Sequence, residues 1–442
     1  MVSMVLVLFH AAAALTWASQ PPWTGRLTVR QPHSLQPGEE DGAADQSAKL
    51  DEERTGNCTV ALPKKFTGLQ SARTWPSRRP AAPPELENIT HAKDGFFAPA
   101  ESLPVTTLSS AIMHSQQPDA CSKAKFLLVE DESEGAGLGW TAHLMTLALS
   151  IAMREGRVMI EVQTKQPRWC TRAPYTMQCF YEPWTPCATP PQKGVDNATK
   201  WQPDGSHSEA QLATLALSRF ATEGFWWGTG NVISAELNAA LTQHLFTARP
   251  WLQEIAGCYM AECQITAGSF VDVHVRDSPE KREERGDAAT LDEYATAMQQ
   301  ELEESHATTV HLQTANPRLL DRFVRIASEH NVTLCYTDNE RSVSDVWGGR
   351  VDDDSLKIRE AVTGAVNALI GSQAESFISP ESSAWTWFIM NMMPGDERPE
   401  VNESSKDLRT LRPVCKWRRR RRGRGCPKQR ERLRNASRSS GE

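Results

Sequence analysis

The sequence lacks several short motifs by which nucleotide- and metal-binding proteins are commonly recognised. It has no phosphate loop ending in Lys and Ser or Thr, and "GAGLGWTAHL" at 135–144 departs from the G-x-G-x-x-G pattern. The stretch "RWCTRAPYTMQCFYEPWTPC" at 168–187 has neither the paired short Cys spacing nor the flanking His of a zinc site. A phosphate-loop nucleotidase is therefore excluded, and the sequence offers no support for a zinc module.

The chain also lacks an apolar run of the roughly 20 residues that a membrane-spanning helix needs. Its longest candidate, from Met4 to Ala18 and interrupted by His10, is shorter and ends in small residues typical of a cleavage site. We interpret residues 1–18 as a signal peptide, with a short type II membrane anchor as the alternative. A buried helix is less well supported, because the following hundred residues offer little for it to pack against.

Cysteines and glycosylation sequons indicate the compartment. Ten cysteines, an even number, can form disulfides in an oxidising environment, and Cys170, Cys179 and Cys187 crowd one loop while Cys258 lies near Cys263. Six Asn-x-Ser/Thr sequons lie at Asn57, Asn88, Asn197, Asn331, Asn402 and Asn435. Together with the N-terminus they predict the secretory pathway, in the Golgi lumen, for an anchored or a soluble protein.

Composition divides the 442 residues into a body and two tails. Residues 19–115 are rich in Pro, Ser, Ala and charge without apolar periodicity, which predicts a disordered stem. Residues 396–442 are predicted to be a basic disordered tail, because residues 406–438 contain 15 Lys or Arg and only 2 Asp or Glu. The whole chain has a net charge of −7, so the residues outside 406–438 carry a net charge of −20. We favour a solvated tail that touches a membrane or an acidic partner over a nucleic-acid-binding one, because a nuclear address conflicts with the N-terminal run.

Between the tails, strand-like and helix-like segments alternate, which predicts an α/β fold with parallel sheets. We expect an N-terminal lobe at 116–265 and a second lobe at 266–395, both Rossmann-like, with a cleft between them. The expected strands are 126–130, 157–162, 270–275, 309–313, 332–336 and 376–379. The expected helices are 140–156, 208–222, 234–246, 250–262, 290–304, 317–330, 355–371 and 382–393.

Candidate anion-binding residues follow two of the expected strands. "FVDVHVR" ends on His274 and Arg276, and a guanidinium suits bidentate pairing with phosphate. "SFISPESSAW" places Ser382 and Ser383 at the start of a helix, where free backbone N–H groups bind anions. Each feature has an ordinary alternative, a surface ion pair for Arg276 and a simple helix cap for the serines. At the carboxyl edge of one sheet they would jointly suit a pyrophosphate.

Several segments, in this order, resemble the family of the α-1,6-fucosyltransferases that modify N-glycans and of their bacterial chitin-oligosaccharide relatives. The resembling segments are "GAGLGWTAHLMTLALSIAMREGRVMIEV", "ARPWLQEI", "VHVR", "DEYATAM", "VDDDSL" and "SQAESFISPESSAW". They lie between about residues 124 and 393. The family's terminal SH3-like domain has no counterpart in this sequence.

The resemblance implies a GT-B-like fold and inverting, metal-independent transfer of fucose from GDP-fucose, without a cofactor, to a glycan or glycoprotein acceptor. By position it implies a donor-binding set and a catalytic set of residues. The donor-binding set is His143, His274, Arg276, Tyr294, Asn367, Ser382 and Ser383. The catalytic set is Arg276, with Glu280 and Lys281 on the family's Asp-Lys pair, and Glu284 joins it as a candidate base. The resemblance also implies that the first lobe lies on the acceptor side and that the second binds the nucleotide sugar.

The sequence departs from the family pattern where acidic side chains are expected. Ala315 and Asn316 replace an Asp-Asp pair, and Asn367 replaces a helix aspartate, so a different nucleotide sugar or an inactive glycan-binding relative remains an alternative. The loop after Arg276 reads "DSPEK", one residue longer than the family's Arg-Thr-Asp-Lys.

The transfer needs a base for the acceptor hydroxyl, and the candidates are Glu280, Glu283, Glu284 and Asp287. "RVDDDSL" at 350–356 offers a manganese-type Asp-x-Asp as a competing site. We interpret it instead as a helix start, where acidic residues complement the helix dipole.

Overall fold

The computed structural model describes about half of the chain. The described residues are 29–30, 75, 79, 105–131, 137–162, 176–190, 192–202, 206, 208–217, 235–276, 290–314, 316–337, 354–380, 383–393 and 415–418. The predicted signal peptide or anchor at 1–18 lies outside them, as do most of the predicted stem and basic tail.

The second lobe contains a sheet of six strands whose four central strands are parallel. Their order is β8 (Thr333–Thr337), β7 (Thr309–Thr314), β6 (Val271–Val275) and β9 (Ser376–Ser379). If these four strands are numbered in the order in which they occur along the chain, their spatial order is 3-2-1-4, which is the order of a doubly wound nucleotide-binding sheet. Two antiparallel strands complete the edges, β1 (Val29–Arg30) beside β8 and β10 (Cys415–Arg418) beside β9.

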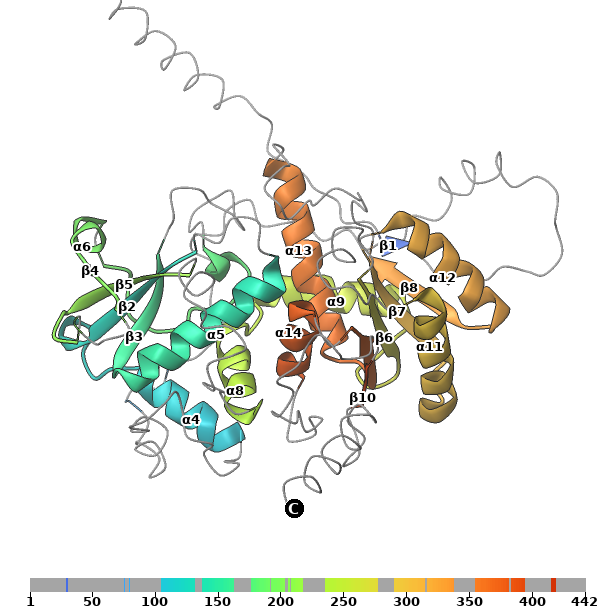
Figure 1. Cartoon of the computed structure of the whole chain (residues 1–442), viewed down its shortest axis with the longest axis horizontal. Helices are drawn as coiled ribbons and strands as arrows, with labels where there is room; N and C mark the ends of the chain where they lie inside the picture. Colours follow the sequence, from blue (N-terminus) through green and yellow to red (C-terminus); the bar gives the residue numbers. More distant parts are fainter. Residues whose placement is uncertain are drawn as a thin grey trace, which may run out of the picture.

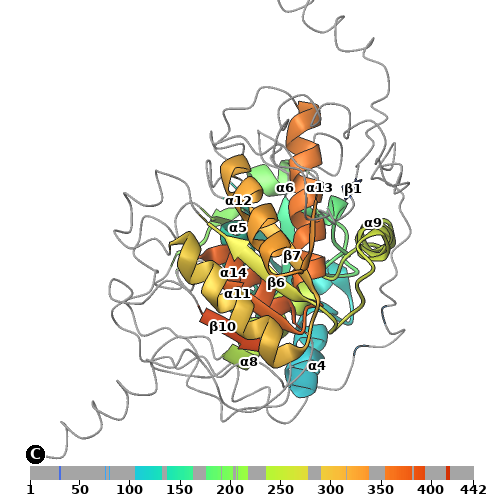
Figure 2. The same cartoon turned by 90° about the vertical axis from the view of Figure 1, so that its right-hand side faces the viewer.

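Helices cover both faces of this sheet. Figure 2 shows α11 and α12 in front of the sheet, and their apolar side chains pack with Val271, Val273 and Val275 of β6. The alternate residues of β6, Asp272 and His274, therefore face the other side, where α13 and α14 lie. The helix bounds are α11 (Leu291–Ser305), α12 (Pro317–Glu329), α13 (Asp354–Gly371) and α14 (Ala384–Met392).

The first lobe contains a four-stranded, fully parallel sheet. Its order is β3 (Arg157–Val162), β2 (Lys125–Glu130), β5 (Leu212–Ala216) and β4 (Thr199–Lys200). Its helices are α4 (Val105–Gln116), α5 (Leu138–Arg154), α6 (Gln192–Asp196), α8 (Ala235–Leu245) and α9 (Pro250–Glu262), with 3-10 turns at Cys121–Lys123 and Met177–Cys179. Two parallel sheets covered by helices confirm the predicted α/β class with two Rossmann-like lobes.

One predicted element was wrong. The sequence analysis expected a helix at 208–222, because Ala and Leu are strong helix formers. Leu212–Ala216 instead forms β5, which pairs in parallel with β2 and alternates between buried and half-buried residues. Pairing with β2 outweighs local propensity at this position.

The described elements also extend beyond the predicted lobe boundaries. Helix α4 begins at Val105, inside the predicted stem, because Leu108 and Ile112 bury their side chains in the first lobe's core. Residues 29–30 of the same stem pair with β8, and residues 415–418 of the predicted disordered tail pair with β9. These short segments are ordered by backbone hydrogen bonds to existing sheet edges.

The two lobes share one hydrophobic core. Figure 1 shows α13 and α14 between the two sheets, and α14 contacts both α5 and α8 of the first lobe. The shared cluster joins Leu149 and Leu245 of the first lobe to Val366, Phe388 and Ile389 of the second. Burial of apolar surface across this boundary holds the lobes together.

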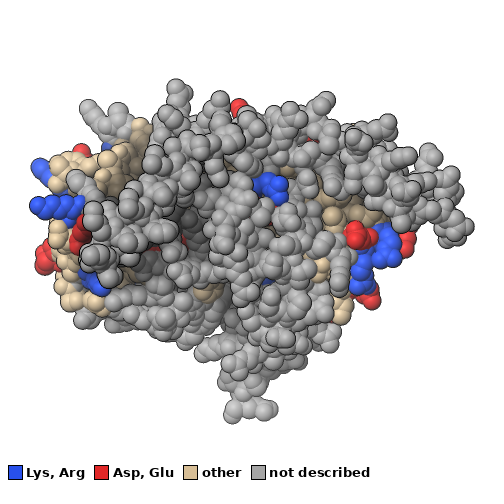
Figure 3. All heavy atoms as spheres, turned by 90° about the horizontal axis from the view of Figure 1, so that it is seen from above, with Lys and Arg blue, Asp and Glu red and all other residues tan. Residues whose placement is uncertain are grey.

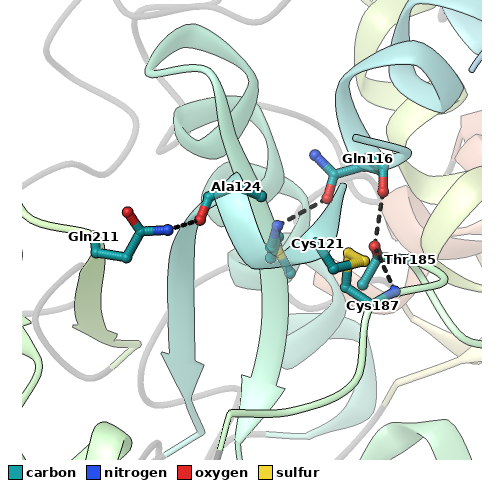
Figure 4. The surroundings of a disulfide bond; sticks show 7 residues. Gln116, Cys121, Ala124, Thr185, Cys187 and Gln211 are labelled. Atoms are coloured by element: carbon teal, nitrogen blue, oxygen red, sulfur yellow. Dashed lines mark hydrogen bonds between the residues drawn. A yellow bond between two sulfur atoms is a disulfide. The ribbon is translucent and has the colours of Figure 1, made fainter. Parts of the chain in front are cut away.

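Two disulfides join segments distant in sequence. Cys121 bonds Cys187, and Figure 4 shows Thr185 beside them, where its hydroxyl donates to the Gln116 carbonyl at 2.7 Å and accepts from the Cys187 N–H at 3.2 Å. Cys263 at the end of α9 bonds Cys335 in β8. Neither pairing joins near neighbours in sequence, because the sheets bring distant segments together. Cys179 and Cys258 are also disulfide-bonded.

Among the described residues no helix is both long and apolar enough to cross a membrane. Two sequons fall within them, at Asn197 and Asn331, and both asparagines are exposed. On the face seen in Figure 3, described side chains of both charges intermix at the end of the molecule formed by α12.

Removing the Cys263–Cys335 bridge should lower the free energy of unfolding by about 2–4 kcal/mol, because the bridge restricts the unfolded chain. Cys263→Ala, Cys335→Ala and the double variant can be compared by urea unfolding. Each single variant should show nearly the whole bridge loss, since one missing sulfur breaks the bond. Fully additive losses in the double variant would contradict the bridge.

Candidate functional site

The candidate site lies at the carboxyl ends of β6 and β9. These strands are parallel neighbours, with Val271 opposite Ser376 and Val273 opposite Ile378, so the residues that follow them meet at one edge. The order of the sheet reverses between these two strands, and open α/β sheets bind ligands at that position. Arg276 follows β6, and Ser383 follows β9 as the N-cap of α14.

His274 is a neutral side chain in this site. Burial, and secondarily the positive charge of Arg276, lower its pKa to about 3. Its Nδ1 atom is buried and has no hydrogen-bond partner among the described residues. The ring faces Trp385 at the start of α14, with centroids 6.4 Å apart. At neutral pH it therefore contributes hydrogen-bonding atoms rather than charge, and Arg276 supplies the positive charge.

The first turn of α5 reaches this site through Gly139. A Cβ atom at Gly139 would lie 2.7 Å from both the Cα and the N of Trp385, so only glycine lets α5 approach α14 this closely. The two helices begin side by side, α5 after its N-cap Gly137 and α14 after its N-cap Ser383. Both helix starts carry partial positive charge, which favours an anion.

His143 lies one helical turn after Gly139, on the same side of α5. Its ring is 6.5 Å from the ring of Trp140, and burial lowers its pKa to about 4. The structure thus places a second neutral histidine on the helix that packs against α14.

A hydrogen-bonded chain of buried side chains supports Trp385. The indole Nε1 donates to Oε1 of Gln313 at 2.8 Å, and Nε2 of Gln313 donates to Oδ2 of Asp272 at 2.7 Å. His311 Nδ1 lies 3.1 Å from the same carboxylate oxygen. Burial raises the pKa of Asp272, while His311 and then Gln313 act against that rise. This chain connects α14 to β6 and β7.

The sequence analysis did not single out Asp272, His311, Gln313 or Trp385. The available signal was polar residues on one face of two otherwise apolar strands, in "FVDVHV" and "TVHLQ". Strand pairing then places Asp272 opposite His311 and His274 opposite Gln313.

Asn367, predicted to bind the donor, joins this support. Its side-chain oxygen accepts a hydrogen bond from Thr337 at 3.0 Å, and its backbone carbonyl accepts one from Gln313 at 3.2 Å. One turn further along α13, a Cβ at Gly371 would lie 2.6 Å from Oδ2 of Asp272. The structure therefore gives Asn367 the role of tying α13 to β7 and β8.

Tyr294 is not brought together with His274. It is 1% exposed and packs in the apolar cluster with Val273 and Val275, on the opposite face of the sheet from His274. Its predicted role in donor binding stays a prediction.

The other predicted site residues divide between described and undescribed positions. Ser383 is the N-cap of α14 but its side chain makes no capping hydrogen bond. Glu280, Lys281, Glu284 and Ser382 lie outside the described residues, so their predicted roles stay predictions.

The competing metal interpretation receives no support from the described residues. They contain no group of three or more His, Cys, Asp or Glu placed to hold a metal ion. Helix α13 begins at Asp354, as expected if these acidic residues start a helix, and Asp352 and Asp353 lie outside the described residues.

Comparison with known proteins gives only remote likenesses. No protein-family model and no curated protein matches the chain. An Arabidopsis thaliana FUT1 mutant in complex with GDP matches 65% of this chain and 72% of its own, with 9% identity and a TM-score of 0.36. POFUT1 in complex with GDP matches 61% and 95%, with 12% identity and a TM-score of 0.34; POFUT1 with GDP-fucose matches 60% and 70%, with 8% and 0.29. At such identities and scores the likeness carries no inference about activity.

Gly139→Ala should destabilise the protein by about 1–3 kcal/mol, because the added Cβ meets backbone atoms of Trp385 that cannot move aside. Gly137→Ala is the matched control, since a Cβ there has no atom within 4 Å. Thermal unfolding of the two variants measures the difference. Equal melting temperatures would show that α5 and α14 are not in close contact.

His143 and His274 should lower the free energy of unfolding as the pH falls from 7 towards 4, whereas the raised pKa values of Asp272 and Glu161 act in the opposite direction. The unfolded chain takes up protons near the ordinary histidine pKa of 6.5, whereas folded His143 and His274 stay neutral down to about pH 4 and about pH 3. His274→Gln should reduce this dependence, measured by urea unfolding at several pH values. His330→Gln, at an exposed residue, is the control. An unchanged dependence in His274→Gln would contradict a buried neutral ring.

Proposed function

We propose that this protein is a glycosyltransferase that moves fucose from GDP-fucose to a hydroxyl group of a glycan or glycoprotein. One observation carries the proposal. His274 faces Trp385 at the start of α14, Arg276 follows it at the end of β6 where the order of the second sheet reverses, and α5 of the first lobe closes on the same helix start through Gly139. This arrangement suits a nucleoside diphosphate held in the second lobe and facing the first.

The leaving group determines which charge the site must stabilise. In inverting transfer the acceptor oxygen attacks the anomeric carbon, the bond to the phosphate oxygen breaks, and negative charge grows on the diphosphate. Arg276 and the first N–H groups of α14 can stabilise that charge without a metal ion. Fixed donors of this kind contribute about 3 kcal/mol or more each in a site that excludes water.

The acceptor hydroxyl must lose its proton to a base. Glu280 and Glu284 follow Arg276 closely in sequence and remain our candidates. Among the described residues of the first lobe, Glu161 is poorly suited to act as this base. It is 3% exposed, both of its oxygens accept from the Met177 N–H, and burial raises its pKa well above the ordinary value. Because both oxygens are already engaged inside the core, Glu161 is poorly placed to take a proton from an acceptor.

Fucose as the donor sugar rests on the ordered segments that resemble the α-1,6-fucosyltransferases. The alternative is that the donor is another nucleotide sugar, and Asn367 is relevant to it because it replaces an aspartate of the family. Its side chain and carbonyl are engaged by Thr337 and Gln313 in the described structure, so replacement of the family's aspartate there alters the support of α13. The second alternative is that the protein is an inactive, glycan-binding relative. Measuring the turnover of nucleotide sugars distinguishes these alternatives.

We also propose that the protein acts in the secretory pathway. The disulfides Cys121–Cys187 and Cys263–Cys335 and the exposed sequon asparagines Asn197 and Asn331 support this compartment. Membrane anchoring would depend on residues 1–18.

Arg276→Ala should abolish most of the thermal stabilisation by GDP and lower the rate of GDP-fucose turnover about 100-fold or more, because the diphosphate loses its main cation. Arg322→Ala, at an exposed position on α12, removes the same side chain elsewhere and should bind GDP normally. Thermal shift with GDP and donor hydrolysis with a panel of nucleotide sugars provide the measurements.

The outcomes separate the alternatives. Equal shifts by GDP in wild type and Arg276→Ala would remove Arg276 from the site. Turnover of a different nucleotide sugar in preference to GDP-fucose would correct the donor. Glycan binding without turnover of any donor would contradict the enzyme and leave a binding protein.

A further inference from the structure

A cavity of about 430 Å³ lies between the lobes, away from the site described above. Its walls are formed by the ends of α8, α13 and α14 and by one side of α9. Examples are Phe246 directly after α8, Leu369 of α13, Met392 of α14 and Met260 of α9. Helix α14 begins at the candidate site and ends at this cavity, a span of nine residues or about 13 Å. The volume is typical of a small-molecule site.

The described lining is polar but uncharged. It presents Gln243, Gln253, Thr247 and Ser372 beside the apolar side chains, and no Asp, Glu, Lys or Arg is among the described lining residues. These residues therefore offer no counter-charge to an anion, such as a nucleotide, or to a cation. An uncharged ligand is the best match.

Three glutamines line the cavity, and two of them, Gln243 and Gln253, are held in place by the fold. Nε2 of Gln243 donates to the Met393 carbonyl at 2.8 Å, and Nε2 of Gln253 donates to the Ala248 carbonyl at 2.8 Å. Each amide keeps its Oε1 acceptor and a second N–H donor for other groups. Paired acceptors and donors beside apolar surface match hydroxyl groups, which both donate and accept, on a carbon ring.

Space for a ligand is open at Gly257. This residue lies on the solvent-exposed side of α9 at the open mouth of the cavity, and a Cβ placed there would have no atom within 4 Å. Glycine inside a helix costs roughly 1 kcal/mol relative to alanine, so nothing in the packing of α9 requires it. A glycine facing an open cavity leaves room for another molecule.

From these observations we infer that the cavity is a second sugar-binding site, which holds an uncharged segment of an oligosaccharide. It is separate from the proposed donor site, because the two lie at opposite ends of α14. The inference does not depend on the identity of the donor or on turnover. It assigns to the interface of the two lobes a role in holding a glycan.

Gly257→Leu tests the site, because the leucine side chain fills the open space while removing glycine from a helix favours folding. Gly257→Ala is the matched control, with the same backbone change and far less added volume. Saturation-transfer difference NMR on the full chain, with uncharged chitotetraose, cellotetraose and mannotetraose as probes, measures binding directly. A heparin-derived tetrasaccharide serves as the charged probe.

We expect at least one uncharged tetrasaccharide to bind the wild type and Gly257→Ala alike. Its Kd should rise about tenfold or more in Gly257→Leu, a loss of about 1.4 kcal/mol, and excess GDP should leave the signal unchanged. The inference is overturned if no uncharged probe binds, if Gly257→Leu binds as the wild type does, if the charged probe binds in preference, or if GDP displaces the sugar. Loss of GDP binding in Arg276→Ala bears only on the donor site, so the two proposals fail separately.

Discussion

The hydrogen bonds from Trp385 through Gln313 to Asp272 determine where the candidate site can form. A buried carboxylate must be fully partnered, and loss of one partner of such a charge costs about 3–5 kcal/mol. Asp272 meets this requirement with His311 and Gln313, and the spare oxygen of Gln313 then fixes the indole of Trp385. The start of α14, and with it the position of the ring beside His274, therefore follows from a constraint inside the core.

The sequence predicted the framework of the second lobe well, because its strands and helices alternate with clear periods. "FVDVHVR" correctly placed Arg276 just beyond a buried strand, at the carboxyl edge of the sheet. The chain Asp272–Gln313–Trp385 escaped prediction because strand periodicity assigns a residue to a face of the sheet but not to a partner on a helix. Similarly, the position of Tyr294 in the sequence did not show that α11 covers the face of the sheet opposite His274. Strand β5 was missed because its Ala and Leu residues prefer helices until β2 provides an edge.

The shared core limits how the lobes can move. Side chains of α5, α8, α13 and α14 interdigitate in one cluster, and close-packed interiors do not deform continuously. Because this core is rigid, the distance and orientation between the two ends of α14 are fixed. One end lies at the candidate functional site and the other at the cavity lined by Gly257.

Strand β10 has a consequence for solubility. Its four residues, Cys415 to Arg418, pair with all four residues of β9, which would otherwise be the bare edge of the sheet. An uncovered edge is a template for association with other chains, and cationic side chains are a common protection against it. The arginine run begins within β10 itself, at Arg418, so one segment both covers the edge and adds like charge that repels a second copy. A C-terminally shortened form would lose this protection and be prone to aggregate, even though its candidate site would be complete in sequence.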